Sequence, residues 1–127
     1  MSFKKFVFAC VLVGIFASAA AALNLNFKLV NRTGATFYRV YLKPSEISTW
    51  DADLDEIVGG LPLKNGETLN IDMSNNKDRV RYRHWDLRVY LQDGYYLQYN
   101  NINLSAISRF TIDSRGRATD DLGNYYD

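Results

Sequence analysis

The sequence has few of the residue types that build metal centres and covalent catalytic sites. Its 127 residues include one cysteine, Cys10, and one histidine, His84. A single cysteine forms no disulfide within the chain, and one histidine falls short of the four nitrogen or sulfur ligands of structural zinc. No serine stands in the Gly-x-Ser-x-Gly frame that presents a catalytic nucleophile. We therefore expect a protein that is not an enzyme.

An excess of charge of one sign is also absent. The chain has 15 Lys and Arg against 14 Asp and Glu. Without the first 22 residues, which include Lys4 and Lys5, 13 cations face 14 anions, a net charge of −1 with His84 neutral. A balance this close to zero predicts neither a nucleic-acid partner nor binding to an acidic membrane surface.

The first 22 residues have the pattern of a secretory signal peptide. Two lysines precede an apolar run, and residues 17–22 are all alanine or serine. This order of positive, apolar and small residues predicts export followed by cleavage. Cleavage after Ala22 fits best, and cleavage after Ala19 fits second best.

Export predicts a periplasmic or secreted domain that meets the membrane only on its way out. The alternative is a retained anchor, because residues 6–22 are near the short limit for a membrane span. Removal of residues 1–22 also removes Cys10, so the remaining domain, residues 23–127, has no disulfide and depends on its core for stability.

Alternation of apolar and polar residues continues through most of residues 23–127. Apolar side chains at every second position are typical of strands with one buried face. The predicted strands are 25–29, 36–42, 69–73, 80–92, 95–99 and 108–113. No segment after residue 22 has a helical period. The sequence therefore predicts a single antiparallel β-sandwich, immunoglobulin-like or similar, of about six or seven strands, with a partly open barrel as the alternative.

Two turns predict hairpins. Residues 31–34 read Asn-Arg-Thr-Gly and are predicted to join the first two strands, because Asn and Gly tolerate the positive φ of a tight reversal. Asp93-Gly94 is predicted to join the strands 80–92 and 95–99 in the same way. Three segments are predicted to be loops: 43–56, 74–79 and 114–127.

The strand predicted over residues 80–92 has two different faces. The face predicted to be buried carries Trp85, Leu87, Val89 and Leu91. The opposite face carries Tyr82, His84, Asp86, Arg88 and Tyr90. A flat surface of tyrosine and arginine suits recognition of a protein or a glycan. We therefore expect a binding surface formed by four of these residues and a tryptophan from the preceding loop: Trp50, Tyr82, His84, Arg88 and Tyr90.

The alternative for this face is ordinary cross-strand packing, with Asp86 and Arg88 in local ion pairs. The returning strand adds one of two pairs to the face, according to its register: Tyr96 and Gln98, or Tyr95 and Tyr99. Trp50 is a candidate recognition residue or, alternatively, a plug that closes one end of the sandwich.

A loop in the first half of the domain carries a second candidate site. Asp51, Asp53 and Asp55 have the spacing with which a loop turns successive carboxylates toward one calcium ion. An EF-hand would continue with Gly at its sixth position and Glu at its twelfth, where this chain has Glu56 and Pro62. A calcium-dependent β-domain is one alternative function, and a solvated acidic loop is the competing interpretation. No other cofactor is predicted.

A third functional class is inhibition of a hydrolase in the periplasm. Small exported β proteins fill such a role by inserting a loop into the cleft of an enzyme. The three predicted functions thus share a compartment and differ in the partner, which is an unknown protein or glycan, a calcium ion, or a hydrolase.

Several short motifs together resemble a protein family. They run in order through the domain: Asn31-x-Thr33-Gly34, Tyr41-x-x-Pro44-Ser45, Trp50-x-x-Asp53-Leu54, Gly66-Glu67, and Trp85-Asp86-Leu87-Arg88-Val89 before Asp93-Gly94. With these motifs, the stretch from Asn26 to Asp113 resembles a family of small exported bacterial proteins of uncharacterised function. The resemblance implies a β-sandwich in the periplasm or outside the cell, and it implies no established activity.

The chain departs from that family pattern at two places. Relatives usually have a glycine after the tryptophan and a cysteine shortly before the Asp-Leu-Arg piece. This chain has Asp51 at the first place and Arg83 or His84 at the second. Any bridging or ligating role of that cysteine is therefore absent here.

Overall fold

The computed structural model describes residues 23–50, 55–74 and 81–127. The predicted signal peptide, residues 1–22, lies outside the described residues. Within them the chain forms nine strands and one 3-10 turn, and no helix is long and apolar enough to cross a membrane.

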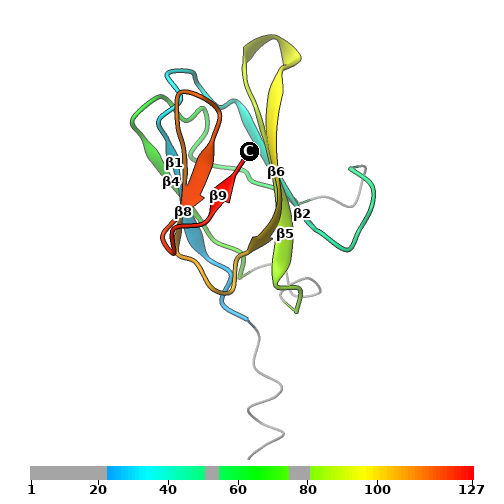
Figure 1. Cartoon of the computed structure of the whole chain (residues 1–127). Coiled ribbons are helices and arrows are strands. Elements are labelled where there is room, and N and C mark those ends of the chain that lie inside the picture. Colours follow the sequence, from blue (N-terminus) through cyan, green and yellow to red (C-terminus); the bar gives the residue numbers. More distant parts are fainter. Residues whose placement is uncertain (1–22, 51–54, 75–80) are drawn as a thin grey trace, which may run out of the picture.

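The strands form two sheets that face each other, so the predicted all-β sandwich is confirmed (Figure 1). One sheet has five strands, in the order β4 (Thr68–Ile71), β1 (Phe27–Asn31), β7 (Arg109–Ile112), β8 (Ala118–Asp120) and β9 (Tyr125–Tyr126). The other has four, in the order β3 (Asp55–Glu56), β2 (Arg39–Pro44), β5 (His84–Tyr90) and β6 (Tyr96–Asn103).

The hairpin predicted around Asp93-Gly94 is confirmed. Strands β5 and β6 pair antiparallel, with Tyr90 opposite Tyr96, and the turn between them contains the 3-10 segment η1 (Gln92–Gly94). Asp93 and Gly94 have φ values of 66° and 81°, the left-handed conformation that this reversal requires and that Asp and Gly tolerate.

The other predicted hairpin is wrong, because the segments that residues 31–34 connect lie in different sheets. Strand β1 pairs with β4 on one edge and with β7 on the other, so neither edge is open to β2. The pairing of β1 with β7 is parallel, which departs from the all-antiparallel prediction. The buried Asn31 side chain stabilises the crossing, since its Nδ2 donates to the carbonyl oxygens of Ala35 and Leu63 at 2.8 and 2.9 Å.

The C-terminal segment 114–127, predicted to be a loop, contains β8 and β9. It lacks a clear apolar alternation because only a few side chains reach the core. Ala118 is fully buried, and Tyr126 packs on Phe110 with ring centroids 5.1 Å apart. The buried residue between them is Asp120, a polar residue whose hydrogen bonds the periodicity does not reveal.

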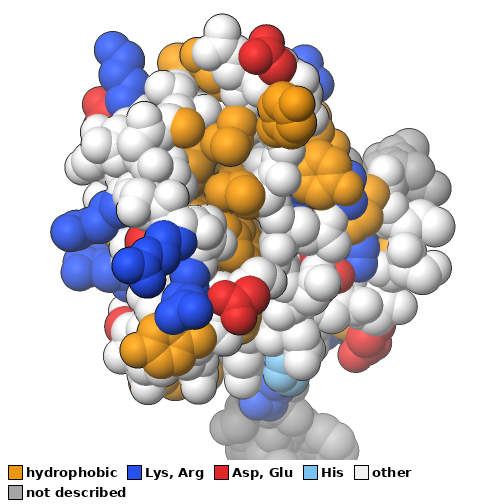
Figure 2. Space-filling view, turned by 45° about the horizontal axis from the view of Figure 1, so that its top comes forward, with side chains coloured by type: hydrophobic (Ala, Val, Ile, Leu, Met, Phe, Trp, Pro, Cys, Tyr) orange, Lys and Arg blue, Asp and Glu red, His pale blue; other side chains and the backbone are white. Residues whose placement is uncertain are grey.

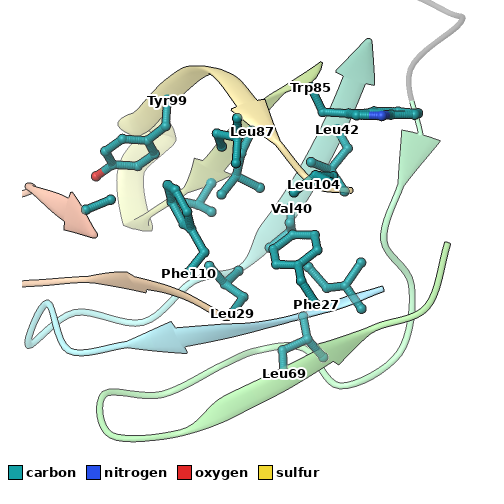
Figure 3. Close-up of a cluster of buried hydrophobic side chains, with 14 of the residues drawn as sticks. Phe27, Leu29, Val40, Leu42, Leu69, Trp85, Leu87, Tyr99, Leu104 and Phe110 are labelled. Carbon is teal, nitrogen blue, oxygen red and sulfur yellow. The ribbon is translucent and has the colours of Figure 1, made fainter. Parts of the chain in front are cut away.

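The core fills the space between the sheets. Figure 3 shows side chains of the two sheets pointing toward one another, among them Leu29 and Phe110 from one sheet and Val40 and Leu87 from the other. Trp85, predicted to be buried, is 0% exposed, and its indole Nε1 donates to the carbonyl oxygen of Tyr82 at 2.9 Å. Because one face of the four-stranded sheet is committed to this core, its other face is available for a site.

Candidate binding site on the four-stranded sheet

Three adjacent strands place a set of aromatic and basic residues side by side on the outer face of the four-stranded sheet. The register sets Tyr41 of β2 opposite Arg88 of β5, and Arg88 opposite Gln98 of β6. One pair further along, Arg39, Tyr90 and Tyr96 are aligned in the same way. Their neighbours along the strands, such as Val40, Leu87 and Val89, are buried, so alternation directs this set outward. We call these six residues together with Trp50 the Arg88 face: Arg39, Tyr41, Trp50, Arg88, Tyr90, Tyr96 and Gln98.

Arg88 lies at the centre of this face with its guanidinium held in place. Its Cζ is 4.4 Å from the ring centroid of Trp50 and 4.1 Å from that of Tyr96, distances typical of cation–π contacts. Nε and Nη2 donate to Gln98 Oε1 at 2.9 and 2.6 Å, and Nη1 donates to the Tyr90 hydroxyl at 3.3 Å. The planar group is therefore preorganised before any ligand binds.

The tyrosines around Arg88 pack on one another. The rings of Tyr41 and Tyr90 meet edge to face with centroids 5.6 Å apart, and those of Tyr90 and Tyr96 are 5.3 Å apart. Nη1 of the exposed Arg39 donates to the Tyr41 hydroxyl at 3.1 Å, which places this second guanidinium beside the tyrosines. Aromatic rings with few rotatable bonds make a surface that loses little entropy when a ligand covers it.

The Arg88 face borders a hollow of about 550 Å³, a volume within the range of small-molecule sites. Six of its lining residues are aromatic or arginine: Tyr38, Arg39, Tyr41, Trp50, Arg88 and Tyr90. A second hollow of about 380 Å³ shares Tyr38 and Leu91 with the first and extends toward Tyr95. The second hollow lies between the segment 34–36 and the β5–β6 turn.

A buried ion pair holds the loop that brings Trp50 to the face. Lys43 Nζ donates to Asp86 Oδ2 at 2.7 Å, and the two side chains are only 5% and 11% exposed. The same Nζ donates to the carbonyl oxygen of Ile47 at 2.5 Å and lies 5.2 Å from the Trp50 ring centroid. Ser45, at the start of the loop, donates its hydroxyl to Asp86 Oδ1 at 2.7 Å. One carboxylate therefore anchors both the strand end and the loop.

A bulge in β6 completes the surroundings of Asp86. The register between β5 and β6 shifts between Trp85 and Leu87, and Asn101 has a φ of 60°. This conformation aims the Asn101 amide at Asp86 Oδ1, at 2.9 Å. Burial alone would raise the pKa of Asp86, but the hydrogen bonds from Lys43, Ser45 and the Asn101 amide outweigh it and hold that pKa below its ordinary value.

The structure divides the five residues of the predicted binding surface. Trp50, Arg88 and Tyr90 lie together and line the hollow. His84 is exposed at the start of β5, opposite Asn103, and is not among the lining residues. Tyr82 packs against the hydrophobic core instead. Asp86 forms its ion pair with Lys43.

Sequence reasoning missed the contribution of β2 to this site. Tyr38, Arg39 and Tyr41 belong to the predicted strand 36–42, for which the turn at 31–34 predicts a hairpin with the first strand. Its true neighbour, β5, follows more than 40 positions later in the chain, and periodicity carries no signal for such a pairing. The sequence allows either Tyr96 and Gln98 or Tyr95 and Tyr99 beside Arg88 and Tyr90. In the structure these partners are Gln98 and Tyr96.

The predicted calcium site falls mostly outside the described residues, which include neither Asp51 nor Asp53. Asp55 begins β3, where its backbone pairs with Leu42. Within residues 23–50, 55–74 and 81–127, no group of three His, Cys, Asp or Glu side chains is placed to hold a metal ion. Calcium binding by this loop stays a prediction.

The described residues that line the hollow include guanidinium, phenol and indole groups and no carboxylate, thiol or imidazole. They offer hydrogen-bond donors and flat apolar faces, which suit binding more than proton transfer. Comparison of the chain with protein-family models, with curated proteins and with solved structures finds no match.

Proposed function

We propose that this chain is an exported binding domain and that its ligand-binding surface is the Arg88 face. The observation that carries the proposal is the fixed guanidinium of Arg88, which contacts Trp50 and Tyr96 at the edge of a hollow of about 550 Å³.

Preorganisation is what makes this surface suited to binding. Arg88 already has its orientation set by Gln98 and Tyr90, and the tyrosine rings support one another. A ligand that meets a rigid surface does not have to offset the entropy of ordering it. Arginine and aromatic residues also dominate the energetic centres of known recognition sites.

Binding is tested by screening arrays of glycans and of peptides with the full-length gene product as recovered from cells. We expect the ligands retained by the wild type to be lost with the double variant Arg88→Ala, Tyr90→Ala. The matched control is Arg115→Ala, which removes an exposed arginine from the turn between β7 and β8. The conservative pair Arg88→Lys and Tyr90→Phe guards against loss of folding, which near-ultraviolet circular dichroism reports. Equal retention by all variants would show that ligands bind elsewhere.

The export part of the proposal rests on the N-terminal sequence. Expression of the complete chain in a bacterium, followed by mass measurement of the protein outside the inner membrane, gives the cleavage position. We expect a chain that begins at Leu23 or, second, at Ala20. Recovery of the chain only inside the cell, still beginning with Met1, would contradict export.

A further inference from the structure

The hollow beside the Arg88 face carries positive charge among its described lining residues. Arg39 and Arg88 both line it, and no Asp or Glu of the described ranges 23–50, 55–74 and 81–127 does. The third cation of the region, Lys43, is already matched by Asp86. Glu56 of β3 lies opposite Tyr41 of the neighbouring strand β2. It is exposed and is not part of the lining. A ligand that carries an anionic group would therefore complement the site.

Arg88 and the tyrosines that line the hollow keep hydrogen-bond donors for a ligand. Arg88 has five N–H groups and makes three hydrogen bonds to the described residues, so two N–H groups remain for a ligand. The hydroxyls of Tyr41 and Tyr90 accept from Arg39 and Arg88, so each still has its O–H to donate. These remaining donors favour a ligand rich in acceptor oxygens.

The shape of the lining adds a second requirement. The rings of Tyr41 and Tyr90 line the hollow and meet edge to face, and Trp50 adds a larger flat surface over Arg88. Flat apolar surfaces pack well against a saturated ring whose C–H groups gather on its faces and whose oxygens project from its rim. Sugar rings have this division between face and rim. The combination with two guanidiniums favours a sugar that bears a carboxylate, because Arg matches carboxylate geometry with paired N–H groups.

From these three observations we infer that the hollow binds a carboxylated sugar, as in a uronic-acid unit of an acidic polysaccharide. The inference rests on the proposed function, since it names the ligand class of the Arg88 face. An acidic peptide shares the carboxylate but lacks the ring, and a neutral glycan shares the ring but lacks the charge. Both therefore serve as comparison ligands.

A second basic region makes the choice of variants important. Figure 2 shows basic side chains gathered on the side of the molecule that carries the five-stranded sheet. Lys28 and Arg109 lie opposite each other on β1 and β7 and are both exposed. A polyanion could be attracted to such a cluster without specific recognition, and this attraction depends on charge alone.

The experiment is a calorimetric titration of the complete gene product, as cells release it, with three probes. The probes are a short oligogalacturonate, the same oligomer with its carboxylates methyl-esterified, and a glutamate peptide of equal charge. We expect the acidic oligomer to bind about tenfold or more tightly than its ester, the effect of roughly one charge-assisted hydrogen bond. We also expect it to bind more tightly than the peptide, which keeps the carboxylates but has no sugar ring to cover the aromatic surface.

Two variants that keep the charge assign the binding to one face. Lysine retains the positive charge of arginine and loses its planar fork and its stacking. Arg88→Lys is therefore expected to weaken binding of the acidic oligomer by about tenfold, whereas Arg109→Lys leaves it unchanged.

Each other outcome overturns the inference in a distinguishable way. Equal binding of the ester shows that the protein does not recognise the carboxylate. Equal binding of the peptide shows that it does not recognise the sugar ring. In both cases a continued dependence on Arg88 leaves the proposed function standing. Loss of binding with Arg109→Lys but not with Arg88→Lys places the ligand on the other sheet, and absence of any binding by the folded protein excludes acidic sugars as the ligand class.

Discussion

Asp86 of the four-stranded sheet and Asp120 of the five-stranded sheet are both 7% exposed, but the two carboxylates are held in different ways. Asp86 faces a buried cation, Lys43, at 2.7 Å. The donors to Asp120 among the described residues are all neutral: the backbone amides of Leu122 and Asn124, the Asn124 side-chain amide and the Tyr126 hydroxyl, all within 3.0 Å.

The difference follows from what each carboxylate organises. Asp120 closes the turn between β8 and β9, a local structure whose own amides are near enough to satisfy it. Asp86 joins two segments that are distant in sequence, β5 and the end of β2 with the loop that follows it. Lys43, its register partner on β2, supplies the counter-charge while the apolar stem of the lysine stays covered, and Ser45 donates to the same carboxylate from the loop. The ion pair therefore couples the stability of the sheet to the position of Trp50.

The largest effect is expected from breaking the ion pair on one side. Asp86→Ala leaves Lys43 buried without its counter-charge, and removal of one partner of a buried pair costs about 3–5 kcal/mol of unfolding free energy. Urea denaturation of both proteins measures the difference. The matched control is Lys43→Met, Asp86→Leu, which removes both charges and is expected to recover most of the loss. Equal losses in the single and double variants would show that packing, and not the unpaired charge, sets the cost.

Acid should weaken the protein through both carboxylates. Burial would raise the pKa of Asp120 as it does that of Asp86, but the hydrogen bonds from Asn124, Tyr126 and the Leu122 amide prevail and lower it. A carboxyl whose pKa is depressed on folding stabilises the fold above its unfolded-state pKa of about 3.9, and that contribution is lost as the pH falls through the lower, folded-state pKa. Thermal unfolding from pH 7 downward should show a falling midpoint below about pH 4.

The double variant Lys43→Met, Asp86→Leu sharpens this prediction, because it removes Asp86 and keeps Asp120. Its midpoint should fall less steeply with acid than that of the wild type. A profile parallel to the wild type would mean that Asp86 does not contribute to acid sensitivity.

A smaller effect is expected from Asp120→Asn. The amide keeps the shape of the carboxylate and its Oδ1 contacts, but it replaces one charged acceptor by a donor, at a cost of about 1–2 kcal/mol. The variant also changes Tyr126, whose pKa is raised by burial first and then by its hydrogen bond to Asp120. Absorbance titration at alkaline pH should show the tyrosinate forming at lower pH in the variant. An unchanged titration would leave burial as the sole cause of the raised pKa.

The same two aspartates show how far the sequence predicts this molecule. Alternation identified β5 and the burial of Trp85, because a period of two is written in adjacent residues. It also predicts that Asp86 and Arg88 lie on the outer face of the sheet, and the structure confirms this. It could not show that Asp86 is buried there, since the covering loop and Lys43 come from a part of the chain some 40 residues away.

Pairing between strands is the step at which sequence reasoning failed. The turn at Asp93-Gly94 predicted its hairpin because the turn itself fixes the pairing. The turn at residues 31–34 has similar chemistry, yet it carries the chain from one sheet to the other, because β7 and β4 occupy both edges of β1. The Arg88 face depends on the pairing of β2 with β5. Local sequence patterns do not report this pairing, so they do not predict that Tyr41 of β2 belongs to the face.

The smallest effect on stability is expected at the centre of the candidate site. Arg88 is half-buried at the surface, and its contacts with Gln98, Tyr90 and the two rings are of the kind that lysine partly replaces, so Arg88→Lys should lower the unfolding free energy by less than about 1 kcal/mol. Such a result would set Arg88 apart from Asp86, which lies two residues away on the same face of β5. A side chain held this precisely for so little stability is better explained by a ligand than by the fold. A loss as large as that of Asp86→Ala, measured by the same urea denaturation, would instead make Arg88 a structural residue and remove the main support for a binding surface on this sheet.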